Sequence, residues 1–88
     1  MKSWKRRDDW VGTQVEDHLV MINVESGRYV ALNDTAAEAW RLLEEPRDQD
    51  ALVTALTGTF NIDREACTRS VSELMDRMRS LDLIEVAP

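Results

Sequence analysis

The first third of the chain has the hydrophobic pattern of β-strands. Residues 10–16 (WVGTQVE) alternate approximately between apolar and polar side chains, and residues 19–24 (LVMINV) form a nearly continuous apolar run of strand length. A third short stretch, residues 29–32 (YVAL), follows Gly27, which can adopt the positive φ that a short hairpin loop requires. The pattern predicts a three-stranded antiparallel meander.

After this meander the apolar positions change to helical spacing. Asn33 or Thr35 is suited to cap a first helix, because either side chain can accept a hydrogen bond from a free backbone N–H. The helix is expected to end near Glu45, because Pro46 cannot continue it. Its apolar stripe has i, i+3, i+4 and i+7 spacing and consists of Ala36, Ala39, Trp40 and Leu43.

Two more helices are expected in the second half of the chain. One runs from Asp48 or Gln49 to Thr59. The other is capped by Asp63 and is about eighteen residues long. Its seam of apolar residues has the spacing of one helical face: Cys67, Val71, Leu74, Met78 and Leu81. Residues 82–86 either form a short final strand or pack their apolar side chains on the core.

These elements predict an α+β domain in which a three-stranded antiparallel N-terminal sheet is followed by three helices, an order that resembles a winged helix-turn-helix. Residues 10–88 are assigned to this domain. Residues 1–9 are predicted to be a flexible basic segment, in which Trp4 is expected to be frayed. Trp40 lies inside the stripe of the first helix and is expected in the core.

The charge balance narrows the choice of partner. The 88 residues include 11 Lys and Arg against 17 Asp and Glu, which gives a net charge of −6 and no general attraction for phosphate backbones or anionic lipid. No apolar run approaches the roughly 20 residues of a membrane span, and the basic start is not followed by the apolar stretch of a signal peptide. A cytoplasmic protein with no membrane or nucleic-acid partner is therefore expected.

The residue inventory does not favour catalysis or metal binding. A zinc site needs about four Cys, His or carboxylate ligands, whereas the chain has one cysteine, Cys67, and one histidine, His18. Cys67 falls on the apolar face of the third helix, where a free cysteine is usually a small hydrophobe. His18 falls in a hairpin turn, where it is expected to be solvated. We expect no enzyme activity, no cofactor and no metal.

Two binding functions fit the predicted order of elements. The third helix carries four arginines and could read DNA, but acidic residues in the same stretch leave it close to neutral: Glu65, Glu73, Asp76 and Asp82. The strand over residues 29–32 ends the meander, and an open strand edge accepts an extended peptide as a further strand. Peptide binding is the favoured hypothesis, and a winged-helix DNA-binding regulator is the alternative.

Three segments carry a family resemblance. They are residues 20–29 (VMINVESGRY), residues 31–43 (ALNDTAAEAWRLL) and the closing residues 81–84 (LDLI). Together they resemble the PqqD-like family of RiPP recognition elements, and the resemblance covers nearly the whole chain, from about residue 11 to residue 86.

The resemblance implies a non-catalytic peptide-binding module of ribosomal peptide natural product biosynthesis. Such a module holds the leader of a precursor peptide, which adds to the third strand in a groove walled by the third helix, and delivers it to a modifying enzyme. The chain looks most like the stand-alone leader-binding subunit of lasso-peptide systems, which works with a separate leader peptidase. The chaperone of pyrroloquinoline quinone biosynthesis is the alternative within the family.

The resemblance places candidate peptide-binding residues on the third strand and the third helix: Arg28, Tyr29, Val30, Ala31, Leu32, Arg69, Val71, Leu74, Met75, Met78 and Arg79. On the strand, Tyr29 and Ala31 are favoured as exposed, because Leu32 is expected to pack inward with Val30.

On the helix, Met75 is favoured as a wall of the groove, because it lies off the main seam and flexible methionine side chains suit a peptide-binding surface. Three arginines of the helix are candidates for pairing with acidic leader residues or with the peptidase: Arg69, Arg77 and Arg79.

Overall fold

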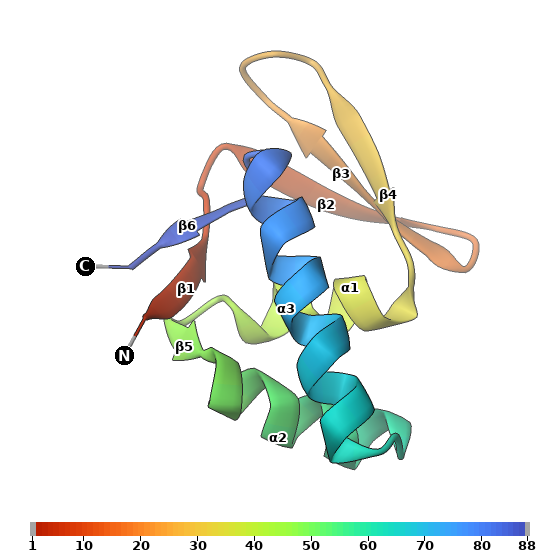
Figure 1. Ribbon diagram of the computed structural model, residues 1–88. Coiled ribbons are helices and arrows are strands. Elements are labelled where there is room, and N and C mark those ends of the chain that lie inside the picture. Colours follow the sequence, from red (N-terminus) through yellow and green to blue (C-terminus); the bar gives the residue numbers. More distant parts are fainter. Residues whose placement is uncertain (1, 88) are drawn as a thin grey trace.

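The computed structural model, which describes residues 2–87, contains two small antiparallel sheets and three helices (Figure 1). The larger sheet has the order β2-β3-β4 and consists of β2 (Trp10–Val15), β3 (His18–Asn23) and β4 (Tyr29–Leu32). These strands agree with the predicted meander to within a residue or two. The predicted α+β class and the three-stranded sheet followed by three helices are confirmed.

The register of this sheet separates two faces. Val11 lies opposite Ile22, which lies opposite Tyr29, so these three side chains share one face. The residues between them point the other way, toward the helices, where Met21 and Leu32 are buried in the core. One face of the sheet is therefore packed and the other faces outward.

A buried asparagine fixes the connection from β3 to β4. The Oδ1 atom of Asn23 accepts hydrogen bonds from the N–H groups of Glu25 (3.0 Å) and Ser26 (2.9 Å). Its Nδ2 group donates to the Oδ2 atom of Asp9 (3.1 Å), and this bond, together with Arg7, lowers the pKa of Asp9. Because folding lowers the pKa of Asp9, its ionised carboxylate stabilises the fold at pH values above the ordinary carboxyl pKa of about 3.9. This stabilisation is lost as the pH falls through the pKa of Asp9 in the folded protein.

The first helix, α1 (Asp34–Leu42), begins where the sequence predicts. Asn33 is the N-cap, and its Oδ1 atom accepts a hydrogen bond from the N–H of Ala36 (2.9 Å). The helix ends three residues before the expected Glu45, so that Leu43 closes it.

The other two helices begin where the sequence predicts. Helix α2 (Gln49–Phe60) is capped by Asp48, and it ends at Asn61, which adopts the left-handed conformation with φ 52°. Helix α3 (Arg64–Ser80) is capped by Asp63 and is the longest element. No helix in residues 2–87 is both long and apolar enough to cross a membrane.

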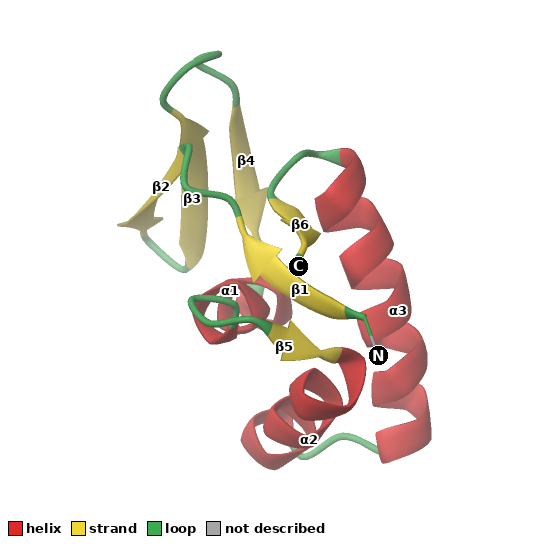
Figure 2. Ribbon diagram, turned by 90° about the vertical axis from the view of Figure 1, so that its left-hand side faces the viewer, coloured by secondary structure: helices red, strands yellow, loops and turns green. Residues whose placement is uncertain are grey.

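The second sheet differs from the prediction for the N-terminal segment. Strand β1 (Ser3–Arg6) lies between β5 (Arg47–Asp48) and β6 (Ile84–Val86), and Figure 2 shows β1 running beside both. Residues 3–6 are therefore a paired strand in place of the expected flexible segment, and the final stretch forms a strand. Residues 1 and 88, which fall in the predicted ranges 1–9 and 10–88, lie outside the described residues.

Burial of an aromatic side chain explains why the N-terminal segment is ordered. Trp4 is only 7% exposed and belongs to the hydrophobic core, against the expectation that it frays. The cationic groups of Lys2 and Arg79 lie 4.9 and 5.9 Å from the centre of its ring. A four-residue strand with a single inward apolar side chain gives too short a pattern to be recognised in the sequence.

The remaining core follows the seam of α3. Cys67, Val71 and Met78 are buried, as the apolar spacing predicts. Trp40 is buried as expected, and the Nε1 group of the buried Trp10 donates to the carbonyl oxygen of Asp82 at 2.8 Å, which ties β2 to the end of α3. The sheet is thus held at a defined position relative to this helix.

We predict that Asn23→Ala lowers the free energy of unfolding by about 1–3 kcal/mol, because it removes the acceptor of two loop N–H groups from a buried position. Urea denaturation measures this difference. The control is Glu25→Ala in the same loop, which keeps the backbone N–H and should change stability by less than about 0.5 kcal/mol. Equal stability of the Asn23→Ala and native proteins would contradict the role given to this asparagine.

Candidate functional site

Strand β4 has one free edge in the part of the chain that the structure describes. It pairs with β3 alone, at the end of the sheet order. The Asn23 N–H donates to the carbonyl oxygen of Arg28 at 2.8 Å, which sets the phase of the hydrogen bonding between the two strands. Because hydrogen-bonded and non-bonded pairs alternate along an antiparallel ladder, the N–H and C=O groups of Tyr29 and Ala31 point away from β3. These groups form a row that another strand can pair with.

An apolar groove of about 350 Å³ lies along this edge, between β4 and α3. Its walls are apolar, and its border is polar. The walls come from β4, from the start of α1, from α3 and from the chain after it: Val30, Ala31, Leu32, Ala36, Leu74, Met78, Leu81 and Leu83. The polar groups at its border are His18, Asn33 and Arg77. The groove can therefore take apolar side chains and has one guanidinium for an acidic group.

Arg28 acts as a brace at the start of β4. Its Nη2 group donates to the carbonyl oxygen of Leu81, the C-cap of α3, at 2.7 Å. Its guanidinium also lies 5.8 Å from the centre of the Trp10 ring. This arginine was predicted to contact a peptide, but the structure uses its side chain to connect β4 with the end of α3.

The exposure of the β4 residues agrees with the predicted orientation. Tyr29 is 76% exposed and Ala31 is also exposed. Val30 is half-buried and Leu32 is buried, and both point toward the core and the groove. Of the predicted strand residues, Val30, Ala31 and Leu32 line the groove, whereas Arg28 and Tyr29 do not.

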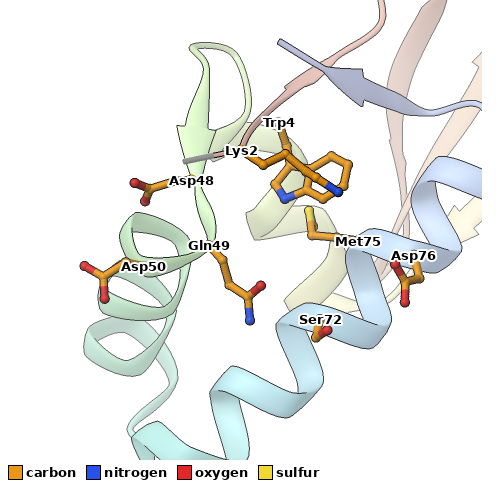
Figure 3. Close-up of a pocket in the computed structure, with 8 residues that line it drawn as sticks. All are labelled: Lys2, Trp4, Asp48, Gln49, Asp50, Ser72, Met75 and Asp76. Carbon is orange, nitrogen blue, oxygen red and sulfur yellow. The ribbon is translucent and has the colours of Figure 1, made fainter.

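The predicted residues of α3 divide between two sides of the helix. Leu74 and Met78 line the groove beside β4. Met75, which the sequence favours, is 2% exposed and lies in another cavity, where its side chain points toward the Trp4 ring (Figure 3). Consecutive helical residues are about 100° apart, so Leu74 faces the groove when Met75 faces the second sheet. Val71 is buried in the core.

The arginines of α3 divide in the same way. Arg77 borders the groove, whereas Arg79 lies over the Trp4 ring on the other side of the helix. Arg69 is exposed and is not among the residues that line the groove. Of the three predicted arginines, only Arg77 lines the groove beside β4.

Sequence analysis missed five residues of the groove: His18, Asn33, Ala36, Leu81 and Leu83. Asn33 and Ala36 were expected only as a cap and an apolar stripe residue of the first helix. Leu81 was placed in the core seam, Leu83 in a final strand or the core, and His18 in a solvated turn. The pairing of Leu19 with Leu32 brings His18 next to the end of β4, and this pairing could have been found by aligning the two apolar strands across the Gly27 loop.

The other free edge of the sheet, along β2, borders a different kind of surface. A cavity of about 410 Å³ beside it is lined by the cationic side chains of Arg6, Arg7 and Arg41. Arg7 is paired with Asp9 at 3.3 Å and Arg41 with Glu38 at 3.5 Å. The two edges of the sheet are thus chemically different, and only the β4 edge runs along an apolar groove.

The cavity between Trp4 and α3 is about 360 Å³ and has an acidic border (Figure 3). Asp48, Asp50 and Asp76 surround it, with the Lys2 side chain lying over the Trp4 ring. In residues 2–87 no group of three or more His, Cys, Asp or Glu side chains is arranged to hold a metal ion.

The single cysteine lies away from each of these cavities. Cys67 is buried on α3, and its Sγ atom lies 4.0 Å from the carbonyl oxygen of Val53. Burial raises the pKa of its thiol, although the charge of Arg64 acts in the opposite direction. At neutral pH the thiol is therefore protonated and shielded, as expected for a core side chain rather than a nucleophile.

A free strand edge bordered by an apolar groove is typical of domains that accept an extended peptide as an added strand. The comparisons with known proteins agree with this class. The chain belongs to the PqqD family, because the family model described as "Coenzyme PQQ synthesis protein D (PqqD)" matches residues 18–84.

Two solved structures have the same fold. "TbiB1 in Complex with the TbiA(beta) Leader Peptide" is 25% identical in sequence, with a TM-score of 0.79, and the match covers 92% of this chain and 94% of that one. "Lasso peptide synthetase B1 complexed with the leader peptide" is 22% identical, with a TM-score of 0.79, and the match covers 93% of this chain and 96% of that one. No curated protein matches the sequence.

We predict that the Cys67 thiol in the native protein reacts with a thiol reagent at pH 8 on the order of 100-fold or more slowly than in the unfolded chain, because reaction requires local opening. Absorbance with Ellman's reagent, with and without denaturant, measures both rates. Equal rates in the two states would show that the thiol is accessible.

Proposed function

We propose that this protein binds the leader region of a ribosomally synthesised precursor peptide and delivers it to a processing enzyme. The leader adds as a strand to β4 and lies along the groove beside α3. The free row of N–H and C=O groups on Tyr29 and Ala31, next to apolar walls, is the observation that carries this proposal.

The comparisons support a leader as the ligand. Both structures with the same fold are complexes with leader peptides, and one of them is a lasso peptide synthetase component. We therefore favour a lasso-peptide system, in which the partner is a separate leader peptidase. Membership of the PqqD family keeps the precursor chaperone of pyrroloquinoline quinone biosynthesis as the alternative.

Recognition in this proposal has two physical parts. Hydrogen bonds between backbones align the leader along β4 and depend little on its sequence. Side chains on one side of the added strand enter the groove between Leu74 and Met78, which selects apolar residues at alternate positions. Arg77 at the border favours an acidic residue near them.

The protein acts in this proposal by holding the precursor rather than by changing it. The shielded thiol of Cys67 is consistent with a protein that supplies no nucleophile. Binding of the leader and the peptidase by one protein makes the second encounter intramolecular and raises the local concentration of the cleavage site.

A likeness to winged helix-turn-helix proteins forms part of the proposal, with α2 and α3 as the helix pair and β3 and β4 as the wing. It does not extend to DNA binding. The net charge of −6 opposes association with a phosphate backbone, and α3 carries acidic as well as basic side chains on its exposed positions.

A proline substitution tests the free edge of β4. Ala31→Pro removes an N–H that points away from β3, so it should leave the sheet intact and weaken leader binding by about 10-fold or more. Fluorescence anisotropy with a labelled leader peptide measures the dissociation constant. The matched control is Gln14→Pro, which removes an outward N–H from β2, the other edge strand, and should leave the affinity unchanged.

The opposite pattern, loss of binding with Gln14→Pro and native affinity with Ala31→Pro, would place the leader on β2. Circular dichroism confirms that both variants are folded.

A charge substitution tests the wall of the groove. Leu74→Asp places a charge among apolar side chains and should weaken leader binding by about 10-fold or more, measured in the same titration. Leu74→Met keeps an apolar wall of similar volume and should bind within about threefold of the native protein. Native affinity of a folded Leu74→Asp protein would remove this wall from the site.

A further inference from the structure

The outward face of the larger sheet is covered with apolar side chains. In the row across the three strands, Val11 is 52%, Ile22 is 41% and Tyr29 is 76% exposed. Val15 and Val24 lie on the same face by the alternation of side chains along a strand and are also exposed. Five of the seven exposed large hydrophobic residues reported for residues 2–87 therefore lie on this one face.

No helix of the described residues covers this face. The helices pack on the opposite face, where Met21 is fully buried, and in Figure 2 they lie beside and below the sheet. Contiguous apolar patches of this kind are uncommon on monomeric proteins and mark interaction surfaces. The leader groove does not explain the patch, because none of these five exposed residues is among those that line it.

The charges at the ends of this face decide between a second copy and a different protein. Glu16 and Asp17 form the turn between β2 and β3, and Glu25 lies in the loop between β3 and β4. Arg28 in that loop is directed to the carbonyl oxygen of Leu81 on α3. Two copies packed face to face would bring acidic ends together in either orientation along the strands, with a net charge of −6 on each. The face fits a partner with an apolar centre and a basic rim.

The position of the face relative to β4 indicates which protein this partner is. Tyr29 and Ala31 belong both to the face and to the strand whose edge is free. A leader strand added to β4 would place every second one of its own side chains beside Tyr29 and Ala31. The face would then be one strand wider, and leader side chains would form its edge. A protein that docks there contacts the sheet and the bound peptide together.

We propose that this outer face, centred on Val11, Ile22 and Tyr29, docks the enzyme that processes the leader-bound precursor. The docking surface of that enzyme would have an apolar centre with Lys and Arg side chains at its rim. This inference rests on the proposed function, because the enzyme is defined by the precursor it processes. It assigns a second surface to the protein, distinct from the groove beside α3.

The test uses the double variant Val11→Glu/Val15→Glu, which changes the face on β2, two strands away from the leader edge. The control is Gln14→Glu, which introduces one negative charge between these positions on the opposite side of β2. The probes are a labelled leader peptide and the purified leader peptidase of the same biosynthetic system, titrated against the full chain loaded with leader.

The inference predicts that the double variant binds the leader within about twofold of the native protein and binds the peptidase about 10-fold or more weakly. Gln14→Glu should leave both affinities unchanged. Glu16→Lys/Asp17→Lys should slow association with the peptidase at low salt, because it opposes a basic rim.

Native peptidase affinity of the double variant would overturn the inference. A native protein that sediments as a dimer, and becomes a monomer in the double variant, would also overturn it and assign the face to a second copy. Failure of the native protein to bind the leader would refute the proposed function itself, and this outcome is recognised in the leader titration before the peptidase is added.

Discussion

A strand in a sheet carries two rows of backbone hydrogen-bonding groups, and β3 satisfies only one row of β4. The rest of the molecule keeps the second row usable. Asn23 fixes the loop that sets the register, and Arg28 connects the start of β4 to the end of α3. The groove exists because α3 packs close enough to leave apolar side chains beside the edge, without itself covering that edge.

The second sheet determines where α3 can lie. Trp4 in β1 packs on one side of this helix, in the cavity that Met75 shares, whereas Leu74 and Met78 face β4 on the other. Strand β6 begins after a short turn that follows α3, and it pairs with β1, so the helix is fixed at its C-terminal end. A helix held from one side can present a constant wall on the other, which a peptide site requires.

The sequence predicted the elements that rest on clear periodicity or capping. The meander, the cap Asp63 and the burial of Cys67, Val71 and Met78 follow from local patterns, and the structure has them. Of the two predicted caps of the first helix, Asn33 and Thr35, the structure uses Asn33. The second sheet could not be predicted, because its strands are two to four residues long and join segments from both ends of the chain. Met75 and Leu74 were both predicted to line the groove and Met75 was favoured, but Met75 lies on the other side of α3 beside Trp4, which was expected to be frayed. The predicted assignment of the strand residues to peptide binding remains to be tested by the substitutions in β4.

The extent of the family match has a practical consequence for work with the isolated domain. The match begins at residue 18, where β3 starts, so a fragment trimmed to it would lack β1 and β2. Such a fragment loses the side chain of Trp4, which covers Met75 on α3. It also loses Trp10, whose indole N–H donates to the carbonyl oxygen of Asp82. Expression plasmids should therefore keep the whole N-terminal region, and an affinity tag ahead of it needs a spacer that leaves the first strand free to pair.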